Sequence, residues 1–185
     1  SAASDVYKRQ DSGNVCVAGF TDGVLSGQIS AGERDAFVRK YDAMGRELWT
    51  RQFGSGAGDQ IWDVSVDARG NIYAVGHTDG TLPGQTSAGG RDAFVRAYDA
   101  GGRELWTRQF GSAASDEAWG VRVDGMGNIL IAGFTDGALP GQTSAGECDA
   151  FVRKYDASGR ELWTRQFGTA LAEMAFDLSV DEGGN

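Results

Sequence analysis

The sequence predicts an all-β fold assembled from repeated four-stranded antiparallel units. A stretch of 25 residues that begins at Ser30 returns at Ser87 and Ser144, 57 residues further on each time, and the three copies agree at 21 positions. Self-similarity at a fixed period of this length indicates an array of supersecondary units. Within each unit, four short runs have the alternation or apolar content of β-strands, and no segment keeps a helical period.

The first two runs of the second unit differ in how they would be buried. Residues 61–67 (IWDVSVD) alternate, so Trp62, Val64 and Val66 are predicted to share one face of a strand. Residues 71–77 (NIYAVGH) are nearly all apolar, as is typical of a strand buried on both faces. We therefore expect an inner strand followed by a fully buried one.

The third and fourth runs complete the unit. Residues 92–98 (DAFVRAY) are rich in the β-branched and aromatic side chains that favour strands. Residues 103–110 (RELWTRQF) alternate and carry charge, which suits an outer edge strand protected against pairing with another edge. Each unit is thus predicted to run from an inner to an outer strand.

The connections between these runs predict the architecture. Short glycine-bearing turns stand at residues 68–70 and 99–102, whereas residues 78–91 and 111–117 form long loops. Because antiparallel strands alternate in direction, the tight turns lie at one end of each sheet and the long loops at the other. Four-stranded antiparallel units in series are typical of β-propeller blades, whose faces are covered by neighbouring blades. The predicted fold class is therefore all-β, a β-propeller built of 57-residue four-stranded antiparallel blades.

Residues 14–185 keep a strict register and are predicted to form the β-propeller repeats. The repeats are residues 14–70, 71–127 and 128–184. Residues 1–13 are irregular, and residues 5–10 (DVYKRQ) resemble the translated end of a transposase adaptor used in DNA libraries. We interpret this start as a truncation or an assembly artefact, which leaves the first unit without a reliable inner strand.

The far end of the chain bears on the number of blades. Residues 175–181 (AFDLSVD) repeat the inner-strand pattern without the rest of a blade. About three blades are present, fewer than the roughly 4 to 8 of known propellers. The main prediction is a fragment of a larger propeller. The alternatives are a homodimer that completes a six-bladed ring and a ring of three blades that closes alone.

One family resemblance agrees with this fold. Residues 70–111 (GNIYAVGHTDGTLPGQTSAGGRDAFVRAYDAGGRELWTRQFG) resemble the SBBP β-propeller repeat of bacterial and archaeal proteins, and the similarity extends over residues 14–185. The resemblance implies a propeller. It also implies an extracellular or cell-surface location, because such proteins are commonly secreted or surface-exposed. The family carries no single catalytic assignment, so the resemblance implies no active-site residues.

We therefore expect a non-catalytic scaffold that presents the long loops on one face to a protein or carbohydrate partner. The alternatives are blades of a larger propeller enzyme whose catalytic residues lie outside this stretch, and a calcium-stabilised structural module. His77, the only histidine, aligns with Phe20 and Phe134, so it is predicted to be a core-facing substitution rather than a base or a ligand. The sequence therefore favours binding over catalysis.

Composition argues against several classes of partner and site. The formal net charge is −9 and basic residues are interspersed with acids in every unit, which argues against nucleic acid. No apolar run approaches the roughly 20 residues of a membrane span, and the start lacks the pattern of a signal peptide. Cys16 and Cys148 occupy different repeat positions, so we interpret them as drift rather than as a disulfide or a metal site.

The long loop after the second strand is the main candidate binding site, because long loops in compact folds often carry function. Its polar side chains could hydrogen-bond a glycan or a peptide, or contribute oxygen ligands to Ca²⁺. The structural alternative is a Thr-Asp-Gly turn, with Leu82 and Pro83 packed on the blade. The loop has no D-x-[DN]-x-[DN]-G ladder, so calcium is weakly supported and no cofactor is assigned. The candidate residues are Asp22, Gln28, Asp79, Gln85, Thr86, Asp136, Gln142 and Thr143.

The second long loop places Asp59, Asp116 and Glu173 at one repeat position. Three carboxylates around the mouth of a channel could bind a cation or a basic partner. Acids at such positions also cap turns, and this structural role is the alternative interpretation.

Aromatic residues recur on the outer strands. Trp49, Trp106 and Trp163 are each followed four residues later by phenylalanine, which puts both rings on one face of the strand. Stacking on sugar rings is one interpretation. Packing between blades is the favoured one, since aromatic side chains contribute large buried area.

Overall fold

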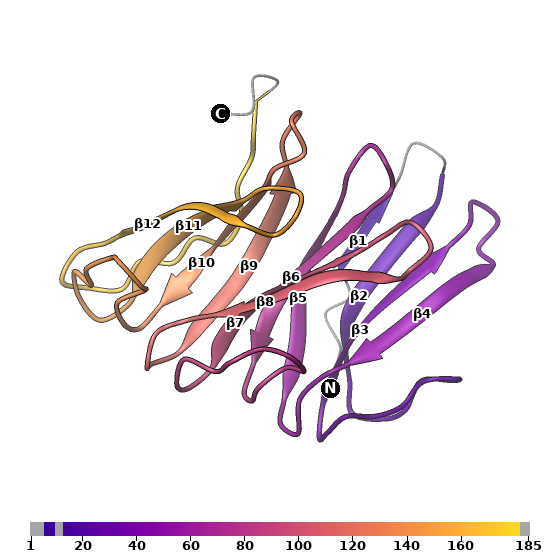
Figure 1. Cartoon of the computed structure of the whole chain (residues 1–185), viewed down its shortest axis with the longest axis horizontal. Coiled ribbons are helices and arrows are strands. Elements are labelled where there is room, and N and C mark those ends of the chain that lie inside the picture. Colours follow the sequence, from indigo (N-terminus) through magenta and orange to yellow (C-terminus); the bar gives the residue numbers. More distant parts are fainter. Residues whose placement is uncertain (1–5, 10–12, 182–185) are drawn as a thin grey trace.

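The computed structural model describes residues 6–9 and 13–181, which form three four-stranded antiparallel sheets (Figure 1). The first sheet contains β1 (Val6–Arg9), β2 (Val15–Thr21), β3 (Asp35–Tyr41) and β4 (Glu47–Phe53). The second contains β5 (Asp59–Val66), β6 (Ile72–Thr78), β7 (Asp92–Tyr98) and β8 (Glu104–Phe110). The third contains β9 (Asp116–Val123), β10 (Ile129–Thr135), β11 (Asp149–Tyr155) and β12 (Glu161–Phe167). The predicted all-β class is confirmed, and these residues contain no apolar helix of membrane-spanning length.

The sheets stand beside one another as successive blades (Figure 1). In each sheet, neighbouring strands follow the order of the chain, and β5 packs against both β2 and β9. Two buried clusters fill the spaces between blades. The cluster between the first and second blades includes Val38, Ile61, Val64, Ile72 and Phe94. The cluster between the second and third blades includes Val95, Val121, Ile129, Ile131 and Phe151.

The tight turns form where the sequence places them. Between β7 and β8, Asp99 Oδ1 accepts hydrogen bonds from Gly101 N at 3.0 Å and from Arg103 N at 2.9 Å. Gly102 closes this turn with a φ of 80°, in the left-handed region that glycine enters without strain. These short turns force β7 and β8 to pair directly, so the long loops gather at the opposite end of the sheet.

The start of the chain differs from the expectation. Strand β1 occupies the inner position of the first sheet and pairs antiparallel to β2, from Val6 opposite Ala18 to Arg9 opposite Val15. The expectation of a missing inner strand is therefore wrong. The interpretation of residues 5–10 as an artefact stays a prediction, and residues 1–5 and 10–12 lie outside the described part of the chain.

The prediction of an inner strand at residues 175–181 is wrong as well. The segment runs along β9 without strand pairing. Ala175 N reaches Gly133 O at 3.4 Å, and Arg122 forms an ion pair with Asp177 at 2.7 Å. Among the described residues, no further strand follows this segment to pair with it, as β6 follows and pairs with β5 and β10 follows and pairs with β9.

Phenylalanines of the outer strands dock on the next blade. Phe53 of β4 meets Phe94 of β7 edge to face, with ring centres 5.7 Å apart and an angle of 81° between the planes. The guanidinium of Arg96 lies 3.9 Å above the centre of the Phe53 ring. Phe110 and Phe151 repeat the edge-to-face contact at 5.7 Å and 82°. The predicted packing of these aromatic residues between blades is confirmed at both junctions.

The tryptophan on the same face fastens each junction. Trp49 Nε1 donates a hydrogen bond to Ala100 O at 3.2 Å, and Trp106 Nε1 donates to Ala157 O at 3.0 Å. The Trp49 ring lies against Gly102, where a Cβ atom would stand 2.6 Å from the ring. Each outer strand thus holds the tight turn of the following blade, and only glycine fits in that turn.

Replacing Phe110 with alanine should lower the free energy of unfolding by about 3–5 kcal/mol, because the change opens a cavity between the second and third blades. Phe167→Ala is the matched control. Phe167 occupies the equivalent position on β12 but is 54% exposed, against 8% for Phe110. At protein concentrations where the chain is monomeric, we expect the control to change stability by no more than about 0.5 kcal/mol. Urea denaturation measures both variants, and equal losses would contradict this packing.

Candidate binding site

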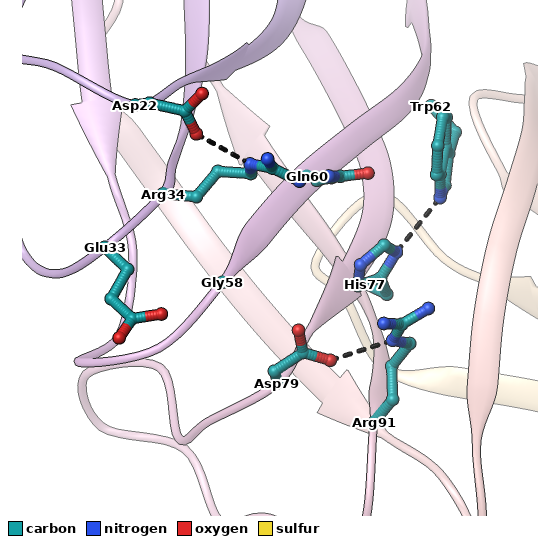
Figure 2. Close-up of a pocket in the computed structure, with 9 residues that line it drawn as sticks. All are labelled: Asp22, Glu33, Arg34, Gly58, Gln60, Trp62, His77, Asp79 and Arg91. Atoms are coloured by element: carbon teal, nitrogen blue, oxygen red, sulfur yellow. Dashed lines mark hydrogen bonds and ion pairs between the residues drawn. The ribbon is translucent and has the colours of Figure 1, made fainter. Parts of the chain in front are cut away.

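A polar pocket of about 490 Å³ opens where the long loops of the first two blades meet β5 and β6 (Figure 2). We call it the loop pocket. The first blade contributes residues from the loop after β2, and the second contributes residues from β5, β6 and the loop after β6. The lining residues are Asp22, Glu33, Arg34, Gly58, Gln60, Trp62, His77, Asp79 and Arg91.

Two arginine–aspartate pairs repeat in this pocket (Figure 2). Arg34 Nε donates to Asp22 Oδ1 at 2.9 Å, and Arg91 Nε donates to Asp79 Oδ1 at 2.8 Å. Each pair joins the two ends of one long loop and so holds that loop closed. Because 37% of each arginine side chain is exposed, the guanidinium N–H groups that no carboxylate of the protein binds can reach a ligand in the pocket.

Glu117 of β9 lies behind the loop pocket, and its side chain is 8% exposed. Its Oε2 accepts hydrogen bonds from Trp62 Nε1 at 3.1 Å and from Trp119 Nε1 at 2.7 Å, while Oε1 accepts one from Arg91. His77 Nδ1 lies 3.5 Å from Oε2 and shares the N–H of Trp62, at 3.0 Å. These donors make a buried carboxylate tolerable, since a buried charge without partners costs several kcal/mol (roughly 3–5).

The same contacts decide the ionisation of Glu117. Burial by itself would raise the pKa of this carboxyl, but the interactions with His77, Trp119 and Arg91 outweigh it and lower the pKa from 4.5 to about 2. The carboxylate therefore keeps its charge through neutral and mildly acidic pH.

Trp62 is the extra residue of a β-bulge. The pairing of β5 with β6 skips it, passing from Ile61 to Asp63. Trp62 therefore lines the loop pocket, while Val64 is completely buried in the core. The prediction that Trp62 shares a face with Val64 is wrong, because an inserted residue shifts the alternation of side chains by one.

A second bulge places Trp119 in the same way on β9, where the pairing with β10 skips it. Glycine on the partner strand makes room for both bulges. A Cβ atom on Gly76 would stand 1.8 Å from Gln60 O, and one on Gly133 would stand 1.9 Å from Glu117 O. Glycine within an otherwise apolar strand is the sequence signal that could have revealed these bulges.

A second, apolar cavity of about 290 Å³ is lined by Trp62, Trp119 and Phe176. We call it the aromatic slot. Trp62 borders both the loop pocket and the aromatic slot. Sequence reasoning missed the aromatic slot, because regular alternation places Trp62 in the core.

The residues predicted in the first long loop have different surroundings. Asp22 and Asp79 line the loop pocket. Asp136 belongs to the third blade, where Cys148 replaces the arginine that pairs with the other two aspartates. Thr86 and Thr143 are exposed. The structure thus brings two of these residues together in one cavity.

The predicted glutamines fasten the loops to their own blades. Gln85 Oε1 accepts a hydrogen bond from Gln109 N at 3.1 Å, and Gln109 Oε1 accepts one from Leu82 N at 2.9 Å. Leu82 is completely buried, whereas Pro83 is exposed. The equivalent contacts join Gln28 to Gln52 and Gln142 to Gln166. This part of the loop therefore has the structural role given above as the alternative to binding. Leu82 packs on the blade as that alternative predicted, but Pro83 does not.

The carboxylates of the second long loop cap that loop. Asp59 Oδ2 accepts hydrogen bonds from Ser55 N at 2.7 Å and Ser55 Oγ at 3.1 Å. Asp116 makes the same bonds with Ser112, and Glu173 makes them with Thr169. Burial raises the pKa of Asp59 and of Asp116. Both side chains are completely buried, so neither presents a carboxylate to a partner.

Other reactive groups are inward-facing. His77 is buried, as predicted, although one edge of its ring reaches the loop pocket. Cys16 and Cys148 are both buried, and burial raises the pKa of each thiol to about 11. Across residues 6–9 and 13–181, no three histidine, cysteine, aspartate or glutamate side chains converge as a metal site requires.

The repeats and the fold define this chain as a set of propeller-like blades. Residues 48–83 match the SBBP family, described as a beta-propeller repeat, so the chain carries a repeat of that family. The chain is 30% identical over 195 residues to the Regulatory protein FlaEY of Caulobacter vibrioides, an alignment that covers 97% of the chain. It spans 20% of the length of that relative. A crystal structure of a protein of unknown function from Bacteroides caccae matches with a TM-score of 0.48 and 12% identity, over 100% of this chain and 64% of the other.

Glu117→Gln should destabilise the fold in a pH-dependent way. Because the pKa of Glu117 is about 2 in the folded chain against an ordinary 4.5, the charge stabilises the fold fully above about pH 4.5. This stabilisation is lost as the pH falls toward 2. The difference in unfolding free energy between wild type and variant should therefore narrow over this window in denaturation experiments. Glu33→Gln, in the same pocket but exposed, controls for the loss of one charge, and a constant difference for Glu117→Gln would refute the assignment.

Proposed function

We propose that this chain is a non-catalytic β-propeller scaffold that holds a protein or carbohydrate partner in the loop pocket. One observation carries the proposal. Exposed arginine and aspartate side chains of two blades converge on one cavity at the long-loop end. At the opposite end, the outer strands of neighbouring blades hold the tight turns at Ala100 and Ala157, while other turns line a second polar cavity of about 620 Å³. The loop pocket is the preferred binding site because it gathers two guanidinium groups beside three carboxylates.

Two further points support this proposal. The Caulobacter relative is named a regulatory protein, and a regulator works by contacting other molecules. The polar groups of the loop pocket also exceed what the fold requires, because the loops are already fastened through Gln85, Gln109 and their equivalents. The extracellular or cell-surface location belongs to the same proposal and rests on the family resemblance.

The double variant Arg34→Ala/Arg91→Ala tests the pocket. Wild type is screened against a random peptide phage library and a glycan array, and selected ligands are then measured on the variant. We expect binding to weaken about tenfold or more, because charge-assisted hydrogen bonds contribute roughly 1.5–3 kcal/mol.

Arg46→Ala/Arg103→Ala is the control. It removes two exposed arginines that pair with Asp42 and Asp99 in the tight turns at the other end of the blades, with the same change in charge. The control should bind every ligand as wild type does. Recovery of no ligand, or equal affinity for both double variants, would remove the loop pocket as the binding site.

We also propose that the third blade packs against a further blade, either from the same polypeptide in a larger propeller or from a second copy in a six-bladed ring. The docking face that β4 and β8 bury is open on β12. Phe167 is 54% exposed, and the tilted and edge-to-face ring contacts of Phe53 and Phe110 have no counterpart for it among the described residues. By analogy with the two observed junctions, the proposed neighbour would offer a phenylalanine and a tight turn to β12.

Phe167→Glu tests this arrangement by light scattering. The wild-type chain should self-associate as its concentration rises, because an exposed docking face seeks a partner, and the variant should not. Leu162→Glu is the control: the equivalent Leu105 stays 42% exposed even though the third blade packs on the second, so this position lies outside the junction. A stable monomer at all concentrations, unchanged by Phe167→Glu, would contradict the proposal.

A further inference from the structure

Trp62, Trp119 and Phe176 occupy one repeat position and gather around the aromatic slot. Phe176 stacks on Trp119, with ring centres 4.9 Å apart and 23° between the planes. No ring contact joins Trp62 to Trp119 within the described part of the chain, and Trp62 instead meets His77 at 5.8 Å. The slot therefore lies between Trp62 and a stacked aromatic pair, where the flat face of a ligand would continue the stack.

Glu117 holds the two indoles of the slot in place. One oxygen, Oε2, accepts both indole N–H groups, and Arg91 binds the other oxygen. Each ring is thereby fixed at its N–H edge, while part of its surface lines the slot. Rings that are immobilised before a ligand arrives lose less conformational entropy on binding, so this arrangement is pre-organised for stacking.

We propose that the aromatic slot and the loop pocket together bind a neutral oligosaccharide, with one sugar ring stacked on Trp62. The inference rests on the proposed function and narrows its partner to a carbohydrate. The C–H face of a pyranose ring packs against an indole as other apolar surfaces do. Because Trp62 borders both cavities, a chain of sugar units that stacks in the slot continues into the loop pocket.

The charges of the loop pocket favour hydroxyl groups over ions. Three carboxylates, from Asp22, Glu33 and Asp79, stand with the two guanidiniums of Arg34 and Arg91. An anionic ligand would meet the carboxylates, and a cationic ligand would meet the guanidiniums. A hydroxyl group donates to the first and accepts from the second at the same time. The net charge of −9 further disfavours an acidic glycan.

The test titrates the chain with cellohexaose, xylohexaose, mannohexaose and chitohexaose, followed by tryptophan fluorescence and by the heat of binding. We expect at least one of them to bind. Trp62→Ala should weaken that binding about tenfold or more, and Trp62→Phe should weaken it less, because the smaller ring still stacks.

Leu162→Ala is the control, since it removes an exposed apolar side chain of β12 that lies outside the blade junction and lines neither cavity, and it should leave the affinity unchanged. Circular dichroism and thermal unfolding verify that each variant is folded. If Trp62→Ala unfolds the chain, the comparison between Trp62→Phe and wild type decides the question.

Two outcomes overturn the inference: none of the hexasaccharides binds, or wild type and the Trp62 variants bind with equal affinity. A peptide that requires Arg34 and Arg91 while every hexasaccharide fails would also overturn it and would leave the scaffold function standing. Failure of peptides and glycans alike would remove both proposals.

Discussion

The docking of each outer strand on the tight turn of the following blade is the constraint on which the structure depends. A single twisted four-stranded sheet has two apolar faces and cannot bury them alone. Phe53 and Trp49 solve this at the first junction by contacting Phe94 and the turn that contains Gly102. Three local features serve this contact. Gly102 leaves room for the Trp49 ring, Ala100 O accepts the indole hydrogen bond, and Arg96 covers the Phe53 ring. Stability therefore accumulates from one blade to the next.

The binding site uses the parts of each blade that this packing leaves free. Two bulges release Trp62 and Trp119 from the core, and a buried carboxylate on Glu117 then fixes both rings. Irregular pairing and a buried charge both lower stability unless other contacts compensate. The bulges and the buried carboxylate both lie beside the loop pocket and the aromatic slot, and this is the physical reason to expect a ligand there. The arginine–aspartate pairs add adaptable polar groups on loops already anchored by glutamine.

Much of the fold was predictable because each repeat shows the same strand periodicity and the same glycine-bearing turns. The strands, the tight turns and the packing role of Trp49 and Trp106 follow from periodicity, glycine and the position of aromatic residues. The loop residues Asp22 and Asp79 were predictable as candidates from loop length alone. The capping role of Asp59 was one of two interpretations, and burial in the structure selected it. The strand β1 was missed because its register breaks with the repeat.

The repeating blade, the order of its strands and the end at which long loops gather follow from the sequence, since these features depend on local periodicity and turn chemistry. The three-dimensional structure was needed to show that Trp62 leaves the core, because a bulge depends on how two strands pair and not on either strand alone. It also brought Glu117 of β9 to Trp62 of β5, His77 of β6 and Arg91 of the next loop. Contacts between blades are set by the packing of whole sheets, so no single 57-residue period contains them.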